Sequence, residues 1–190
     1  MPKSIVNNRY PMGNPRNFRD LVKGKYTALV YQGDNGDLQF AESATLDANA
    51  WLPSGSIAHI ENGVAKPGLG TNAAGKVCVP YIVKVGTEHR TVRSEKFNAA
   101  GGIITLLPLT GYFRLITTVF DKADGLVYSA GDLLTVGEFE YDGKTVYGIT
   151  KAGADLNSKT IVGIVDGPVG TEVKQNDAVA FTAYFKPVVG

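Results

Sequence analysis

Apolar and polar residues alternate over short stretches after residue 26, and Gly, Asn, Asp and Pro separate these stretches. Residues 56–60 alternate, Glu61-Asn62-Gly63 follows as a turn, and residues 64–65 return. Alternation with a period of two between turn residues predicts short strands joined by tight turns. The other predicted strands are 26–31, 38–41, 76–85, 103–107, 112–120, 126–128, 133–136, 145–149, 160–165 and 178–185.

Several connections have recognisable turn chemistry. Asn35-Gly36 is typical of a type I′ hairpin between residues 26–31 and 38–41, and residues 122–125 form another turn. Residues 68–75 are small and predict a hairpin or an Ω-loop, and residues 86–100 predict a long loop or a short hairpin. Pro80 predicts a bulge or an edge position for the strand at 76–85.

One stretch has a helical pattern. Ala and Leu are spaced through residues 41–51, and Pro53 would end a helix there. Gly and Pro together make up 32 of the 190 residues, above the usual share of about 12%. The sequence therefore predicts an all-β fold, a small β-barrel or sandwich with at most one short helix.

The first 25 residues differ from the rest in charge and composition. They contain six basic residues and one acidic residue, whereas residues 26–190 contain 13 basic and 17 acidic residues. Residues 1–25 are also rich in Asn and Pro, so we expect an extended basic arm that becomes ordered only against a partner. Residues 26–190 form a β-rich body, which could consist of two small subdomains divided near residues 101–111.

A weak internal similarity links two parts of this body. Residues 53–60 (PSGSIAHI) and 129–136 (SAGDLLTV) both place a small turn containing Gly before an apolar strand. Eight positions are too few to establish a repeat, so duplication is one hypothesis among others.

Overall composition excludes several classes of protein. The net charge is +1, which gives no general attraction to nucleic acid or to anionic membranes. The single cysteine permits neither an internal disulfide nor a cysteine-based zinc site. The first residues lack the apolar core of a signal peptide, so we expect synthesis in the cytoplasm and no membrane partner.

The chain shows no motif for catalysis or for metal binding. His59 lies in an alternating strand and His89 in a polar loop, without the spacing of metal ligands. Cys78 lies in an apolar strand, where a thiol is usually inert. A serine triad assembled around either histidine stays open as an alternative. We therefore expect no cofactor, no metal and no catalytic residue.

Pairs of acidic residues have a structural explanation. Asp34 with Asp37, and Asp121 with Asp124, flank predicted turns, where carboxylates accept backbone N–H bonds. A weak surface Ca²⁺ site at either pair stays open. Glu138 and Glu140 alternate along one strand and are expected on its solvated face.

Two longer stretches carry a family resemblance. Residues 44–66 contain PSGSIAHIENGVA, and residues 128–168 contain AGDLLTV, TKAG and IVGIVDGP in that order, before a closing AFTAYF. Together they resemble the decoration proteins, also called cement or head-stabilisation proteins, of tailed bacteriophages. The basic arm and the loop at 86–100 depart from short members of that family.

The resemblance implies a non-enzymatic virion protein on the outer capsid surface that bridges capsid subunits. Its partners would be the major capsid protein and further copies of itself, as a dimer or trimer. Arg and aromatic side chains dominate interface energetics. The expected contact residues are therefore Arg9, Tyr10, Arg16, Phe18 and Arg19 in the arm.

An alternative is a carbohydrate- or cell-surface-binding β module of a tail or fibre. It would stack sugars on aromatic rings, for which the candidates are Tyr31, Trp51, Tyr81, Tyr112 and Tyr147.

Overall fold

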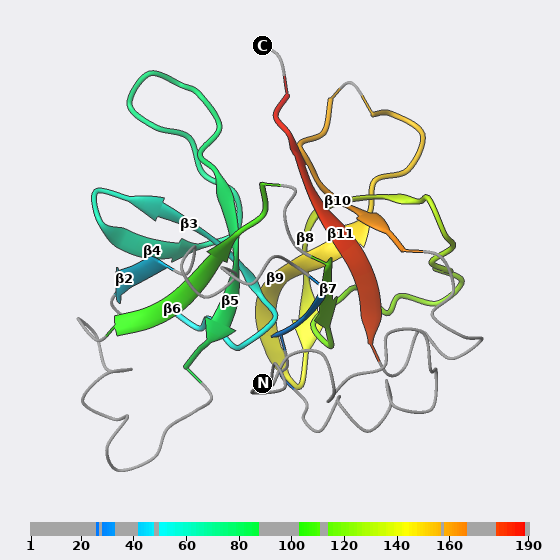
Figure 1. Ribbon diagram of the computed structural model, residues 1–190, viewed down its shortest axis with the longest axis horizontal. Coiled ribbons are helices and arrows are strands. Elements are labelled where there is room, and N and C mark those ends of the chain that lie inside the picture. Colours follow the sequence, from blue (N-terminus) through cyan, green and yellow to red (C-terminus); the bar gives the residue numbers. More distant parts are fainter. Residues whose placement is uncertain are drawn as a thin grey trace, which may run out of the picture.

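The computed structural model describes residues 26, 28–32, 42–47, 50–87, 103–110, 114–156, 158–166 and 178–188. These residues form eleven strands and no helix, which confirms the all-β prediction (Figure 1). The strands are β1 Ala28–Gln32, β2 Glu42–Leu46, β3 Ile57–Glu61, β4 Val64–Pro67, β5 Pro80–Val85, β6 Ile103–Pro108, β7 Arg114–Thr117, β8 Leu133–Tyr141, β9 Lys144–Lys151, β10 Ile161–Val165 and β11 Val179–Lys186.

The strands form two sheets. The first closes into a five-stranded barrel in the order β2-β4-β3-β5-β6. The second contains six strands in the order β1-β7-β11-β10-β8-β9. Most neighbouring strands are antiparallel, and β2 pairs in parallel with β4. Figure 1 shows the barrel on the left and the second sheet on the right.

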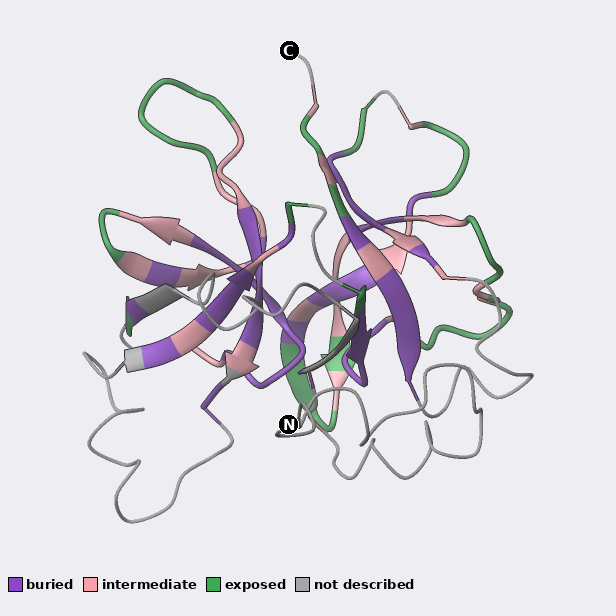
Figure 2. Cartoon of the chain, in the orientation of Figure 1, coloured by how far each residue is buried: buried purple, intermediate pink, exposed green. Residues whose placement is uncertain are grey.

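Two apolar clusters form the core. One fills the barrel and includes Leu46, Val83 and Leu106. The other lies against the second sheet and includes Phe120, Phe181 and, from the barrel, Ile57. The outer face of the barrel therefore packs on the second sheet, and Figure 2 shows buried segments along the strands of both.

Local chemistry sets the two hairpin turns. Asn62 and Gly63 have φ values of 52° and 78°, and Asp142 and Gly143 have φ values of 57° and 70°. Two successive residues with positive φ are characteristic of a type I′ turn, whose twist matches that of the strands. The predicted turn at Glu61-Asn62-Gly63 is confirmed, and the turn at residues 122–125 is too, with a φ of 80° at Gly125.

The helix predicted over residues 41–51 is wrong. Residues 42–46 form β2, which pairs in parallel with β4 and antiparallel with β6. Ala44 and Leu46 are buried and Thr45 is exposed, as in a strand with one face toward the core. Barrel closure outweighs the helix propensity of Ala and Leu, which is only a weak preference.

Three strand predictions also need correction. Residues 126–128 form no strand, and β7 ends at Thr117 rather than at residue 120. Pro80 is the first residue of β5, which lies between β3 and β6; the irregular register comes later, between Val83 and Val85. At a strand start the missing N–H of proline removes no ladder bond. The predictions for residues 1–25, 33–41 and 88–100 lie outside the described residues.

Candidate functional site

The predicted contact residues of the arm lie outside the described residues, and the candidate site begins at the root of the arm, Tyr26. The Tyr26 ring meets the Trp51 ring edge-on, with 5.8 Å between centroids, and the Tyr141 ring at 5.5 Å. Its hydroxyl lies 3.4 Å from Oδ2 of Asp142. Tyr26 thus joins the loop before β3 to the tip of the β8–β9 hairpin.

Two lysines cover the aromatic rings at this root. Nζ of Lys144 lies 3.8 Å from the Trp51 ring centroid. Nζ of Lys122 lies 4.9 Å from the Tyr141 ring and 5.0 Å from the Phe120 ring. Such cation–π contacts contribute about 0.5–1 kcal/mol each at exposed sites. We call Tyr26, Trp51, Lys122, Tyr141 and Lys144 the arm-root cluster.

The strand that follows the root is fixed to both sheets. β1 pairs with β7, with Ala28 opposite Thr117. Nζ of Lys84, in the barrel, donates to the carbonyl of Ala28 at 2.7 Å. Burial lowers the pKa of Lys84. The start of the body is therefore held at one place, although it is distant in sequence from its partners.

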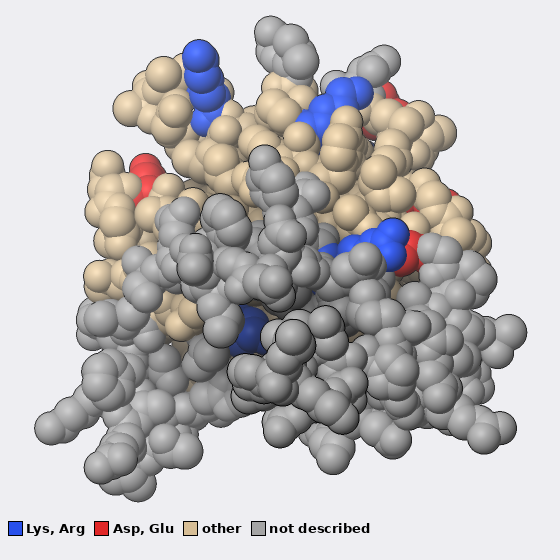
Figure 3. All heavy atoms as spheres, viewed as in Figure 1, with Lys and Arg blue, Asp and Glu red and all other residues tan. Residues whose placement is uncertain are grey.

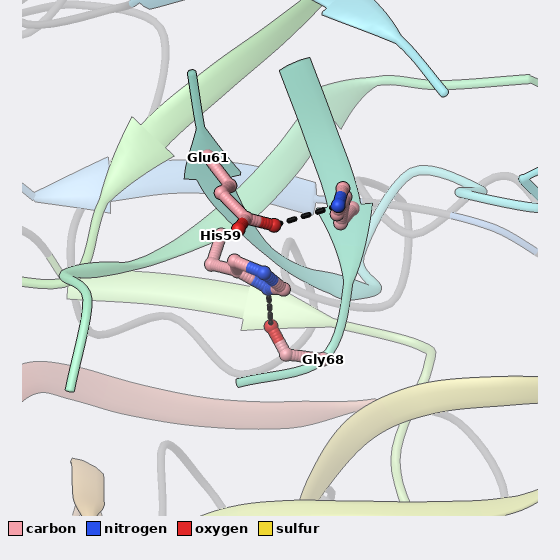
Figure 4. Close-up of polar contacts among 4 residues, drawn as sticks. His59, Glu61 and Gly68 are labelled. Carbon is pink, nitrogen blue, oxygen red and sulfur yellow. Dashed lines mark hydrogen bonds and ion pairs between the residues drawn. The ribbon is translucent and has the colours of Figure 1, made fainter. Parts of the chain in front are cut away.

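His59 has a structural environment. It is 7% exposed, and its Nδ1 lies 3.0 Å from the carbonyl oxygen of Gly68, so Nδ1 carries the proton in this bond (Figure 4). Nearby, Nζ of Lys66 lies 2.6 Å from Glu61. The hydrogen bond from Lys66 lowers the pKa of Glu61, and the same bond raises the pKa of Lys66. His89 lies outside the described residues.

The buried serines and Cys78 are also placed by the backbone. The hydroxyl of Ser54 donates to the carbonyl of Lys84, and that of Ser56 donates to the carbonyl of Pro53. Cys78 is a free, partly exposed thiol just before β5. Ser54 and Ser56 are the two serines nearest to His59 in sequence, and both hydroxyl groups donate to backbone carbonyls.

Asp121 has the turn role expected for it. Its Oδ1 accepts from the backbone of Ala123 and its Oδ2 from the hydroxyl of Thr150, both at 3.0 Å. The described residues contain no group of three or more His, Cys, Asp or Glu placed to hold a metal ion. Asp34 and Asp37 lie outside these residues. Glu138 and Glu140 are exposed, as predicted.

The described aromatic candidates for sugar stacking have internal partners. Nζ of Lys144 lies over the Trp51 ring, and Tyr81 is buried in the barrel core. The hydroxyl of Tyr147 donates to Glu138 at 2.7 Å. This bond raises the pKa of Tyr147. The side chains of Tyr31 and Tyr112 lie outside the described part.

The charged residues are scattered on one face of the molecule. On the face shown in Figure 3, the lysines and arginines of the described residues stand apart from one another and do not form a continuous stripe. Sequence reasoning missed the arm-root cluster because its members come from four distant segments. Their aromatic and basic character gave no local signal.

None of the described residues belongs to a helix long and apolar enough to cross a membrane. Comparison of the chain with protein-family models gives no match, and comparison with curated proteins gives no significant one.

Proposed function

We propose that this protein is a non-enzymatic structural protein of a phage virion, which binds the outer surface of an icosahedral head and bridges neighbouring capsid subunits. The class comes from the resemblance of two segments to decoration proteins. The observation that carries the mode of attachment is the arm-root cluster, from which a basic arm leaves a body of opposite net charge.

Charge favours docking of the arm on an acidic partner. Residues 1–25 carry six basic side chains against one acidic side chain, whereas the body has 17 acidic and 13 basic residues. Opposite charge steers association and fixes orientation. An acidic groove on the capsid protein or on a neighbouring copy of this chain would therefore attract the arm.

The root gives the arm a defined starting point and a long reach. Tyr26 packs on Trp51 and Tyr141, and β1 is fixed to β7. An extended segment of 25 residues spans at most about 85 Å. From one fixed root, the arm can contact a subunit beside the one on which the body lies.

The contact residues in this proposal are Arg9, Tyr10, Arg16, Phe18 and Arg19. Their chemistry is that of interface hot spots. A specific interface of about 1,600 Å² is enough for stable attachment. Self-association as a dimer or trimer would place copies around the symmetry axes of the shell.

A pelleting assay tests this proposal. Heads of the phage that encodes the protein are stripped of it, and either the full chain or a chain starting at Tyr26 is added back at 0.1 M and 1 M salt. The full chain should pellet with heads, and less of it at high salt, because the Debye length falls from about 10 Å to about 3 Å. The shortened chain should pellet weakly while keeping its melting temperature.

Two controls sharpen the assay. A full chain whose first 25 residues are shuffled keeps the charge but loses the order, so it separates general attraction from specific contacts. A chain with Arg9, Arg16 and Arg19 changed to Gln keeps the length. Equal pelleting of the full and shortened chains at both salts would refute the role of the arm, and no pelleting of the full chain would refute attachment to heads.

A further inference from the structure

The two halves of the body have the same strand connectivity. Strands β2 to β6 close in the order β2-β4-β3-β5-β6. Replacing each strand by the one five places later gives the ring β7-β9-β8-β10-β11. The second sheet contains four of the five neighbour pairs of this ring, β8-β9, β8-β10, β10-β11 and β7-β11. We call β2–β6 the first unit and β7–β11 the second unit.

The turn before the second strand of each unit has the same hydrogen bonds. Gly55 N donates to Val83 O at 2.8 Å, and Val83 N donates to Ser56 O at 2.9 Å. In the second unit, Gly131 N donates to Val165 O at 2.9 Å, and Val165 N donates to Asp132 O at 2.9 Å. The φ values agree as well, at 92° for Gly55 and 84° for Gly131.

Closure of each unit also follows one pattern. In the first unit Leu46 pairs with Ala65 in parallel, and Asp47 N donates to Ala65 O at 3.3 Å. In the second unit Phe120 pairs with Ile149 in a parallel bridge, and Asp121 N donates to Ile149 O at 3.0 Å. In the second unit a single bridge therefore stands where β2 and β4 pair in the first, and the rest of the pairing is the same.

Equivalent positions are buried in both units. The strand pairings align seven interior residues of the two units, with one extra residue in the second unit between Thr117 and Phe120. In the first unit they are Ala44, Leu46, Ala58, Ala65, Val83, Ile104 and Leu106, and in the second Thr117, Phe120, Leu134, Ile149, Val165, Val179 and Phe181.

Side-chain volumes compensate within each interior. Ala58 and Ala65 in the first unit correspond to Leu134 and Ile149 in the second. Conversely, Tyr81 packs in the first interior, where the second unit has Gly163. A Cβ at Gly163 would lie 2.6 Å from the Phe181 ring. The Phe181 ring, which is larger than the corresponding Leu106 side chain, therefore fills the space beside Gly163. Cores tolerate such exchanges when total volume is kept.

The correspondence reproduces the similarity seen in the sequence. Residues 53–60 align with residues 129–136 in the register that the hydrogen bonds give, with Gly55 on Gly131 and Ser56 on Asp132. Agreement of connectivity, turn bonds, burial and register distinguishes a repeated unit from two unrelated small barrels.

Each unit also presents an exposed loop between its third and fourth strands. Residues 71–76 of the first unit are exposed, as are residues 153–155 and 158–159 of the second. Both loops project from the same side of the molecule in Figure 1, and both are coloured as exposed in Figure 2.

Hydrogen bonds within each loop stabilise its conformation. Oδ1 of Asn72 accepts from the backbone of Ala74 and of Lys76, each at 3.0 Å. In the other loop, the hydroxyl of Ser158 donates to Oδ2 of Asp155 at 2.6 Å. Loops held in one shape lose less entropy on binding.

We propose that the body is an internal duplication whose exposed loop residues, 71–76 in the first unit and 153–155 with 158–159 in the second, bind two equivalent sites on a repeating protein surface. The proposal rests on the function proposed above, with the capsid lattice as that surface. One chain then takes the place of two single-barrel subunits and links two capsid subunits through its body. The arm adds a third contact of a different kind.

Arginine substitutions at exposed alanines test this bivalent binding. Ala73→Arg alters the first loop and Ala154→Arg the second, and the double variant alters both. Ala123→Arg, in an exposed turn outside both loops, is the matched control. Binding of each labelled full chain to stripped heads is measured as a dissociation constant, and melting temperatures verify folding.

Each single loop variant should weaken binding by a similar factor of about a hundred or more, because linked sites gain about 10²–10⁴ in affinity. The double variant should keep only the binding that the arm supplies. Ala123→Arg should bind with the same dissociation constant as the natural chain. A strong effect of one loop with no effect of the other would refute equivalent sites. If both single loop variants bind as tightly as the natural chain, the loops do not bind the heads, although the protein still attaches to them. If the natural chain itself does not bind, both the bivalent binding and the proposed function are refuted.

Discussion

Replacing Gly70 by alanine should destabilise the first unit through one contact, with the ring of His59. A Cβ built on Gly70 would lie 2.1 Å from Nε2, 2.2 Å from Cδ2 and 2.7 Å from Cε1 of His59. Gly70 does not have the left-handed φ that disfavours other residues. The whole effect should therefore be steric.

The loss of stability follows from the packing and the hydrogen bond that the His59 ring would lose. His59 is buried and holds the carbonyl of Gly68 at 3.0 Å. Overpacking of a filled core costs about 1–3 kcal/mol, and a net hydrogen bond contributes about 0.5–1.5 kcal/mol. We expect Gly70→Ala to lower the free energy of unfolding by about 2–3 kcal/mol.

Urea unfolding measures this effect, with fluorescence of Trp51, the single tryptophan, as the probe. The double variant His59→Ala/Gly70→Ala should be about as stable as His59→Ala alone, because the obstructing ring is gone. Gly75→Ala is a useful contrast. Its φ is 73° with no atom within 4 Å of the new Cβ, so it should cost only the backbone strain of about 1 kcal/mol.

Equal losses from Gly70→Ala with and without the His59 ring would refute the reasoning. That result would place the cost in the backbone or in another neighbour.

Two further outcomes are expected. Partial burial opposes ionisation of Asp132, but the hydrogen bonds from Lys151 and from the Ser129 backbone outweigh it and lower the pKa of Asp132. The ionised carboxylate therefore stabilises the fold above pH 4, and this stabilisation is lost as the pH falls below that. Acid titrations of urea stability should show Asp132→Asn to be less stable by about 1 kcal/mol at pH 7, with a gap that narrows toward pH 2; a constant gap would contradict this. Phe181→Ala should cost about 3–5 kcal/mol, whereas Val127→Thr, at a side chain 62% exposed, should change urea stability by under about 0.5 kcal/mol; equal losses would contradict the burial argument.

The sequence determined the parts of the fold that depend on neighbouring residues. The turn at Asn62-Gly63 follows from residues that tolerate positive φ. Alternation placed β3 and β11 within one residue of their observed ends and β9 within two, since each has one face toward a core. The turn role of Asp121 also followed from its own neighbours.

Tertiary structure decided what depends on partners distant in the chain. Residues 42–46 became a strand because β4 and β6 supply hydrogen bonds that no local pattern shows. The arm-root cluster forms because barrel closure and the β8–β9 hairpin bring Trp51 and Tyr141 to Tyr26. The duplication was nearly hidden in the sequence, because a barrel constrains total interior volume and backbone pairing rather than the residue at each position.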